Sequence, residues 1–265
     1  MAFADKYGPW GIVLGASEGL GEAYARGLAA RGLNVVVAAR RQEPLERVAE
    51  AIAAEHKVET RAVALDLASS DFLDPLRAVT DELEVGLVVY NGAASYVGPF
   101  LDGADSFAAI VAVNCTGQLV VCHHFGRALV DRGRGGIVLM GSASGLAGSP
   151  HISAYAASKA FDLVLGESLW AEWRDRGVDV MTVIGPAIDT PTYRSSLSAE
   201  ARAGLPTPMD PVDVVDDVLA ALGSDPSFVP GEMAKGLALL GKLPRRQQVE
   251  AMAAAQAQLA KGRAP

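Results

Sequence analysis

The sequence predicts an α/β protein built on a doubly wound, parallel β-sheet. Short apolar runs rich in β-branched residues alternate with longer amphipathic stretches along most of the chain. These runs are nearly continuous in apolar residues, which is typical of parallel strands buried on both faces. Their alternation with helical stretches predicts helices on both sides of the sheet. A chain of 265 residues can bury one such core, and we expect residues 1–265 to form a single domain.

The predicted elements follow one another as strand and helix. The predicted strands are Gly11–Leu14, Asn34–Ala39, Arg61–Leu65, Val85–Tyr90, Gly136–Met140 and Val178–Ile184. The predicted helices are Gly19–Arg31, Pro44–His56, Phe72–Leu83, Ala104–Val130 and Ser153–Asp175. A last, weaker strand is expected near Ser227–Val229.

The segment of about 186–211, rich in proline and serine, breaks this rhythm. A long irregular connection in a compact domain is usually functional, and this one follows the sixth strand, at the sheet edge where ligands bind. We therefore expect a substrate lid, although a surface loop without function would have the same composition. The tail, about 244–265, is rich in Ala and Gln and is predicted to be a helix that packs on a partner subunit or frays.

Composition excludes several classes of protein. Lys and Arg number 23 against 31 Asp and Glu, so the basic footprint of a nucleic-acid-binding protein is missing. The two cysteines, Cys115 and Cys122, lie too far apart on a predicted helix to form a disulfide bond, and no Cys/His cluster predicts a metal site. Polar residues interrupt the apolar stretches, and the N-terminus has no signal-peptide core. We therefore expect a cytoplasmic protein without a membrane span.

A glycine-rich turn joins the first predicted strand to the first helix, with Gly15, Gly19 and Gly21 in close succession. Glycines let the backbone approach a pyrophosphate, and the helix N-terminus offers free N–H groups and a favourable dipole. A plain tight turn can carry the same glycines. The strand before it, the helix after it and the βαβ continuation favour a dinucleotide site in a Rossmann-like three-layer α/β/α fold. Ser17 and Leu20 are expected as further cofactor contacts.

The end of the second strand bears on the choice of cofactor. An acid there would bind the adenosine ribose of NAD, whereas this chain has Arg40 and Arg41 and no acid before Glu43. Arginine at this place can hold the 2′-phosphate of NADP. We therefore favour NADP(H), with Arg40 as the main contact and Arg41 as support. NAD(H) stays open, because Glu18 adds a negative charge to the turn and the arginines could be a solvated pair.

Tyr155 and Lys159 are spaced to share one face of a predicted helix. A free tyrosine titrates near pH ~10 and is a poor acid–base group at neutral pH. A neighbouring ammonium favours the phenolate, so Tyr155 could donate a proton to a developing alkoxide or take one from an alcohol. Ser142, after the fifth strand, could hydrogen-bond the substrate oxygen. A lone Tyr-xxx-Lys motif is better explained as a surface pair.

Taken together, these motifs resemble the short-chain dehydrogenase/reductase family of the single-domain type over about residues 8–230. The family's glycine motif is matched by Gly15, Gly19 and Gly21, and its catalytic tetrad by Asn114, Ser142, Tyr155 and Lys159. Ser142 is preferred over Ser144 because it has the usual family spacing before the tyrosine.

The resemblance implies a role for each matched residue. Lys159 would also bind the nicotinamide ribose, and Asn114 would hold, through its helix backbone, a water that relays protons to Lys159. Asp66 would contact adenine and Thr190 the nicotinamide amide. In isolation, Asn114, Asp66 and Thr190 would be a buried amide, a turn residue and a loop hydroxyl. The remaining expected cofactor contacts are Leu67, Asn91, Gly92, Pro186 and Ile188.

Two stretches depart from the family pattern. The family's Asn-Asn-Ala-Gly is replaced by Tyr90-Asn91-Gly92-Ala93, and its Pro-Gly pair after the sixth strand is inverted to Gly185-Pro186. The first change could shift the backbone beside the nicotinamide, and the second could alter the hinge of the lid. Both put the geometry near the substrate in doubt more than the type of reaction.

A narrower likeness is carried by Lys6–Trp10, Gly32–Asn34 and Leu83–Gly86. These stretches resemble 17-beta-hydroxysteroid dehydrogenases and long-chain 3-oxoacyl-CoA reductases. The likeness implies hydride transfer between NADP(H) and a small-molecule carbonyl or secondary alcohol, with an apolar 3-oxoacyl or steroid-like substrate. Family likeness also implies a homotetramer or dimer packed through Ala104–Val130 and Ser153–Asp175. The alternative is a sensor that binds NADP(H) without turnover, but a sensor has no need of an acid–base tyrosine.

Overall fold

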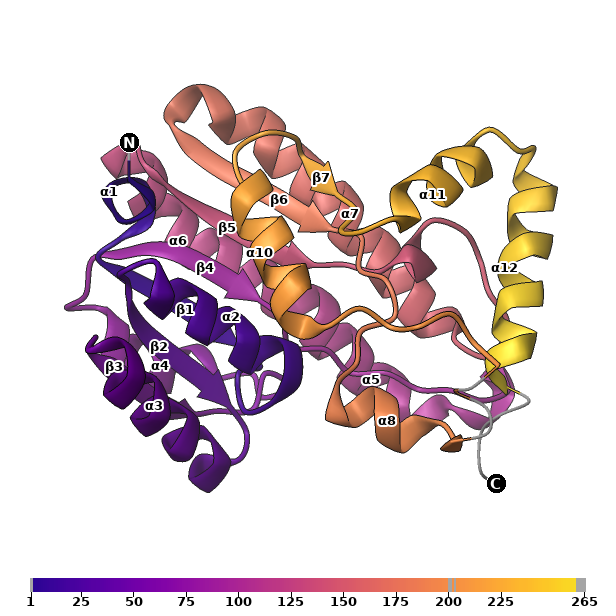
Figure 1. Ribbon diagram of the computed structural model, residues 1–265, viewed down its shortest axis with the longest axis horizontal. Helices are drawn as coiled ribbons and strands as arrows, with labels where there is room; N and C mark the ends of the chain where they lie inside the picture. The colour runs from indigo at the N-terminus through magenta and orange to yellow at the C-terminus, as the bar shows by residue number, and fades with distance from the viewer. Residues whose placement is uncertain (1, 200–201, 203, 261–265) are drawn as a thin grey trace.

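The computed structural model describes residues 2–199, 202 and 204–260. All strands are parallel and form one sheet, in the order β3-β2-β1-β4-β5-β6-β7 (Figure 1). They are β1 Trp10–Leu14, β2 Asn34–Ala39, β3 Thr60–Ala64, β4 Val85–Tyr90, β5 Gly135–Met140, β6 Val178–Val183 and β7 Ser227–Phe228. The strand order reverses beside β1, so that β1 pairs with both β2 and β4. Such a reversal opens a crevice at the carboxyl ends of the strands.

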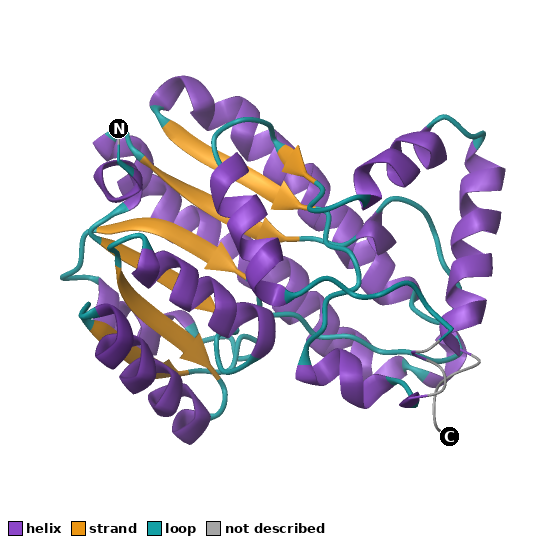
Figure 2. Ribbon diagram, in the orientation of Figure 1, coloured by secondary structure: helices purple, strands orange, loops and turns teal. Residues whose placement is uncertain are grey.

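Helices cover both faces of the sheet, as Figure 2 shows. One face packs against α2 Gly19–Ala30, α3 Gln42–His56 and α10 Pro211–Ala221. The other packs against α4 Leu73–Thr80, α6 Gly117–Arg132 and α7 Ser153–Trp173. The remaining helices are α1 Phe3–Tyr7, α5 Ala104–Val111, α8 Pro191–Ser196, α11 Met233–Gly241 and α12 Arg245–Ala260. The predicted three-layer α/β/α fold is confirmed.

The observed strands begin and end within one residue of the predicted ones. Every residue of β1, β4 and β5 is buried, because helices cover both faces of these central strands. The edge strand β3 instead alternates between more buried and more exposed residues. Continuous apolar runs therefore predict the centre of this sheet well, because the burial that produces them is a property of the strand's position.

The predicted helix Ala104–Val130 is not one continuous α-helix. It divides into α5 and α6, which are joined by a π-helical turn at Ala112–Thr116. The Tyr90 hydroxyl donates a 2.6 Å hydrogen bond to the carbonyl of Val113 in this turn. A Cβ at Gly117 would lie 2.3 Å from that hydroxyl. A side chain inserted against the helical hydrogen-bond ladder is a recognised cause of such a bulge.

The segment 186–211 is less irregular than predicted. It contains α8, which begins with Pro191 and is capped by the side chain of Thr190, and a parallel bridge joins Ile188 to Met209. Residues 200, 201 and 203 of this segment lie outside the described residues. Helix α10, also not among the predicted elements, begins with Asp210 as N-cap followed by proline, a start signal visible in the sequence.

The predicted helical tail corresponds to α12, and residues 261–265 lie outside the described residues. Arg245 donates a 2.7 Å hydrogen bond to the carbonyl of Leu146, and the Ser149 hydroxyl lies 3.5 Å from the carbonyl of Met252. The side chain of Gln256 is buried. Helix α12 therefore packs on the loop that follows β5 of its own chain, at one end of the molecule (Figure 1).

One helical stretch passes the length and composition test for a membrane span. It covers Ala104–Arg132, and its most apolar window has a mean hydropathy of 1.5. In the fold this stretch is α5, the π-helical turn and α6, of which α6 packs one face against β4 and β5, and 39% of the most apolar window is buried. Core helices of globular proteins commonly pass the same test.

Replacing Tyr90 with Phe tests the role of its hydroxyl in the helical bulge. Loss of the donor leaves the Val113 carbonyl with one partner fewer in a buried place, so the free energy of unfolding should fall by about 1–3 kcal/mol. Urea unfolding followed by circular dichroism measures this. Tyr24→Phe is the matched control, since the buried Tyr24 hydroxyl contacts the weakly accepting sulfur of Met140 and should cost less. Equal losses in both variants would contradict the prediction.

Candidate active site

A cleft of about 1140 Å³ opens at the carboxyl ends of the strands, where the strand order reverses. Its walls come from the glycine turn after β1, the loops after β2, β3 and β4, the end of β5, the start of α7 and the segment after β6. The cleft is lined by most of the predicted site residues: Gly15, Ser17, Gly19, Leu20, Arg40, Arg41, Asp66, Leu67, Asn91, Gly92, Ser142, Tyr155, Lys159, Pro186, Ile188 and Thr190. Gly21 and Asn114 lie behind this lining.

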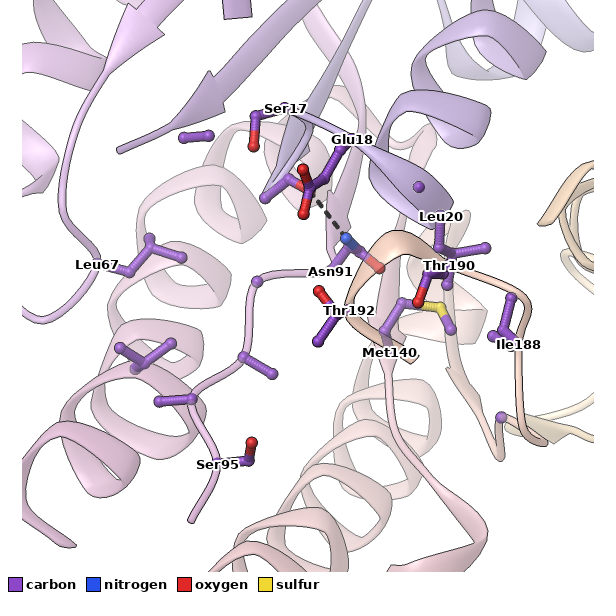
Figure 3. A pocket seen from close by; sticks show the side chains of 18 of the residues that line it. Ser17, Glu18, Leu20, Leu67, Asn91, Ser95, Met140, Ile188, Thr190 and Thr192 are labelled. Carbon is purple, nitrogen blue, oxygen red and sulfur yellow. Dashed lines mark hydrogen bonds between the residues drawn. The ribbon is translucent and has the colours of Figure 1, made fainter. Parts of the chain in front are cut away.

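The glycine turn is packed too closely to accept side chains. Gly15 has a φ of 86° and Gly19 a φ of 59°, both left-handed conformations that favour glycine. A Cβ on Gly21 would lie 1.9 Å from the carbonyl oxygen of Gly15. That carbonyl also accepts a 2.9 Å hydrogen bond from the Asn91 amide, drawn in Figure 3. The turn therefore leaves bare backbone at the N-terminus of α2, which fits a dinucleotide pyrophosphate.

The adenosine end of the cleft contains both predicted arginines. Arg41 is paired with Glu18 through a 2.8 Å contact between Nη2 and Oε2. Arg40 is exposed and has no hydrogen bond or ion pair with the described residues. Asp66 uses Oδ1 to accept a 3.0 Å hydrogen bond from the backbone N–H of Ala68, so it caps a turn as well as lining the cleft. Arg40 is thus the cation free to meet a phosphate here.

Tyr155 and Lys159 stand on the first turns of α7, and Ser142 follows the end of β5. The Lys159 Nζ lies 5.6 Å from the centre of the Tyr155 ring. The Tyr155 hydroxyl makes no hydrogen bond within the described part of the chain, so it is available to a ligand. The Ser142 Oγ contacts both the hydroxyl and the backbone N–H of Ser144 at 3.2 Å. Ser142 lines the cleft and Ser144 is not among its described lining residues, while the choice of Ser142 as the catalytic serine stays a prediction.

Asn114 does not line the cleft directly. Its fully buried side chain exchanges 2.8 Å hydrogen bonds with the backbone of Ala94 and donates a 2.9 Å hydrogen bond to the hydroxyl of Ser158. It thereby ties the π-helical turn to the loop after β4 and to α7. The predicted relay through its backbone stays a prediction, while its side chain has the structural role of a satisfied buried amide.

Lys159 has buried partners that the sequence analysis did not single out. Its Nζ donates hydrogen bonds to Asp162 Oδ2 at 2.8 Å and to the carbonyl of Met140 at 2.7 Å. Gln118, on α6, donates a 2.8 Å hydrogen bond to the other oxygen of Asp162. The i, i+3 spacing of Lys159 and Asp162 was a visible signal, but nothing local pointed to Gln118. Burial lowers the pKa of Lys159, but the charges of Tyr155 and Asp162 outweigh it and raise this pKa above its ordinary value.

The nicotinamide end of the cleft is bordered by the segment after β6. In Figure 3 Thr190 lies beside Leu20 and Met140, and Ile188 lies further along the same segment. The Thr190 hydroxyl accepts a 3.2 Å hydrogen bond from the N–H of Tyr193 as the cap of α8. Its predicted contact with the nicotinamide amide stays a prediction. Beyond the predicted cofactor contacts, this segment also lines the cleft with Ala187, Pro191, Thr192, Tyr193 and Ser196.

A family model described as short chain dehydrogenase matches residues 10–201. The chain belongs to the short-chain dehydrogenase/reductase family. The predicted family, its enzymatic class and its NAD(P)-binding fold are thereby confirmed.

Two kinds of curated relative are similar to this short-chain dehydrogenase. A 7beta-hydroxysteroid dehydrogenase of Clostridium sardiniense is 34% identical over 235 residues, which are 88% of this chain and 89% of that protein. A very-long-chain 3-oxoacyl-CoA reductase of Bos taurus is 35% identical over 182 residues, which are 67% of this chain and 58% of that protein.

Solved structures agree with these relatives. A structure from work on 7beta-hydroxysteroid dehydrogenase stereoselectivity has a TM-score of 0.88 at 29% identity and covers 95% of this chain and 99% of its own. A short-chain dehydrogenase from Sphingobium yanoikuyae in complex with NADPH has a TM-score of 0.75 at 28% identity, with 90% and 94% of the chains covered.

The arrangement suits hydride transfer to a carbonyl in this short-chain dehydrogenase. When bound, the nicotinamide cofactor supplies or accepts the hydride. Tyr155 can donate its proton to the developing alkoxide, and Ser142 can hydrogen-bond the same oxygen. The buried ammonium of Lys159 stabilises the phenolate that remains. In the reverse direction, the phenolate takes the proton of the alcohol.

Replacing Tyr155 with Phe should abolish this proton transfer. General acid–base catalysis contributes about 10²–10⁴-fold, so kcat should fall by that factor while the Kd for the nicotinamide cofactor stays near its wild-type value. Steady-state kinetics and cofactor fluorescence measure the two quantities. Tyr96→Phe is the control, because its hydroxyl contacts only the carbonyl of Pro99 among the described residues and Tyr96 lies outside the cleft lining. Full activity of Tyr155→Phe would contradict the assignment.

Proposed function

We propose that this protein is an NADP(H)-dependent hydroxysteroid dehydrogenase, which interconverts a steroid-like ketone and its secondary alcohol. The extent of similarity to the 7beta-hydroxysteroid dehydrogenases carries this proposal. It spans 88% of this chain and 89% of the Clostridium sardiniense protein, whereas the match to the Bos taurus reductase spans 67% and 58%. Because the match covers nearly the whole length of both proteins, it supports a shared substrate class.

The chemistry of the cleft supports an uncharged, bulky substrate. Beside Ser142 and Tyr155, the lining consists of small or apolar residues from the loop after β4, α5 and the π-helical turn, and of the segment after β6 opposite. They include Ala93, Ala94, Ser95, Ala109, Val113, Ala187, Ile188 and Tyr193, and the segment after β6 adds the uncharged hydroxyls of Thr190, Thr192 and Ser196. Apart from Lys159, the basic residues of this lining are Arg40 and Arg41, at the adenosine end. Among the described residues that line the cleft, no cation at the substrate end could meet the phosphates of an acyl-CoA.

Arg40 supports NADP(H) as the cofactor. It is exposed at the adenosine end of the cleft and free of partners among the described residues, while Arg41 is held by Glu18. A guanidinium in this place can hydrogen-bond a 2′-phosphate through two N–H groups at once. Glu18 would repel the phosphate, but its pairing with Arg41 reduces that repulsion.

The expected cytoplasmic location and homo-oligomer are part of the same proposal. Three large apolar side chains on the helices predicted for the subunit interface are well exposed: Val111, Leu119 and Val164. Burial of these side chains against a second copy would remove apolar surface from water.

The proposal is tested by NADPH oxidation against steroids that carry a ketone at carbon 3, 7 or 17, with a 3-oxoacyl thioester as the competing class. We expect turnover of at least one oxosteroid, with a kcat/KM at least about tenfold above that for the thioester. A Tyr155→Phe sample controls for background oxidation. Preference for the thioester would replace the steroid by a 3-oxoacyl substrate.

Arg40→Ala tests the choice of cofactor. Hydrogen bonds to charged groups contribute about 1.5–3 kcal/mol, so the Kd for NADPH should rise about 10–100-fold while the Kd for NADH changes little. Isothermal titration calorimetry measures both. Arg47→Ala is the matched control, since Arg47 is an exposed α3 arginine paired with Glu43. Equal weakening of both cofactors by Arg40→Ala would show that Arg40 does not read the 2′-phosphate.

A further inference from the structure

Lys159, Asp162 and Gln118 form a buried polar cluster behind the cleft. Lys159 is 2% exposed, and Asp162 and Gln118 are fully buried. Charges in such places are costly unless they are paired and hydrogen-bonded. Both oxygens of Asp162 accept from N–H donors, one from Lys159 and one from Gln118, an arrangement that suits an ionised carboxylate. The oxygen of the Gln118 amide, Oε1, has no hydrogen-bond partner among the described residues. The Gln118 side chain therefore makes its hydrogen bond to Asp162 through the amide nitrogen alone.

The cluster also restrains the position of the ammonium. Lys159 Nζ has three N–H donors, and the carbonyl of Met140 at the end of β5 and the carboxylate of Asp162 take two of them. One N–H is left for a ligand in the cleft that Lys159 lines. Gln118 belongs to α6, so three separate elements together determine where this charge lies.

We propose that Asp162, oriented by Gln118, is a positioning residue for Lys159. It fixes the ammonium at the end of β5 and supplies the counter-charge that keeps it protonated, and so sets the pH range in which Tyr155 transfers its proton. This role is independent of the substrate, because every ketone would meet the same Tyr155 and Lys159.

Among the titratable groups around Lys159, Asp162 is the one that supplies a negative charge to the ammonium. The groups that act on Lys159 are Tyr155 and Asp162 on α7 and Cys115 in the π-helical turn, and Tyr90 and Cys122 lie close enough to feel Asp162. Burial raises the pKa of Cys115 and of Tyr90, and it raises the pKa of Cys122 to about 12. These three groups are therefore neutral in the working range of the enzyme. Burial also raises the pKa of Asp162, against the opposing effect of Lys159.

The test removes this charge by Asp162→Asn and follows pH profiles. Tyr155 and Lys159 titrate as a coupled pair, so removal of a neighbouring anion makes the first loss of a proton easier, whichever of the two gives it up. The alkaline limb of kcat/KM for ketone reduction marks that loss. In Asp162→Asn the alkaline limb should shift to lower pH by about one unit or more, because a charge close to a titrating group usually changes its pKa by that amount. The comparison uses any one ketone that the wild-type enzyme reduces.

A second readout needs neither substrate nor cofactor. The ¹³Cε resonance of Lys159, assigned by its absence in Lys159→Met, reports the protonation of the ammonium directly. Its titration midpoint in the cofactor-free protein should move in the same direction in Asp162→Asn. An enzyme that reduced no ketone would overturn the proposed function but leave this readout intact.

Thr182→Val is the matched control for a purely structural effect. The buried Thr182 hydroxyl donates a 3.1 Å hydrogen bond to the backbone carbonyl of Asp162, so its loss disturbs the same place without removing a charge. We expect Thr182→Val to lower the free energy of unfolding and to leave the alkaline limb of kcat/KM at its wild-type pH. Asp162→Glu, which restores the anion, should return the limb toward the wild-type pH.

The proposal is overturned if Asp162→Asn folds and both its alkaline limb and its Lys159 midpoint stay at the wild-type pH. Should that variant not fold, Gln118→Leu combined with Asp162→Leu removes the whole carboxylate–amide pair, and the same downward shift is expected. If neither variant folds while Thr182→Val does, the cluster serves the structure alone, and the positioning role is wrong.

Discussion

The close packing of α7 against β5 and β6 is the constraint on which the active site depends. A Cβ on Gly166 would lie 1.9 Å from the Thr182 hydroxyl, so only glycine lets the helix come this near to the sheet. A Cβ on Gly145 would lie 2.5 Å from the backbone of Lys159. This approach brings the Lys159 ammonium within reach of the Met140 carbonyl and places Tyr155 on the wall of the cleft. The chemistry rests on two glycines that take no part in it.

The glycine turn after β1 likewise depends on glycines for the close packing that shapes the cofactor site. Gly15 and Gly21 leave no space between them for a side chain, and the Asn91 amide ties the turn to the end of β4. The two halves of the cleft, one for the dinucleotide and one for proton transfer, are thus each positioned by close contacts that only glycine permits. Such contacts are stiff because close-packed interiors adjust little. The arrangement suits a reaction that needs its groups held in place before the substrate arrives.

Much of the fold and of the site could be predicted from the sequence, for physical reasons that differ between elements. The strands were predicted to within one residue because burial on both faces requires a continuous run of buried residues, as in β1, β4 and β5. Tyr155 and Lys159 stood out because their helical spacing occurs together with the glycine turn and Ser142, and their catalytic roles stay predictions. The π-helical turn escaped prediction, because it depends on Tyr90, which is distant in sequence. Gln118 escaped for the same reason, whereas α10 carried a start signal that was overlooked.

Helix α7 and the segment 186–211, which borders the cleft, differ in how freely their sequences can change over evolutionary time. Gly166 and the partners of Lys159 hold α7 from several sides, so few substitutions there are tolerated without loss of the proton donor. The segment 186–211 is held partly by contacts within itself, among them the bridge between Ile188 and Met209. Enzymes of this kind can therefore evolve toward new substrates through substitutions in the segment 186–211, while the catalytic reaction stays the same.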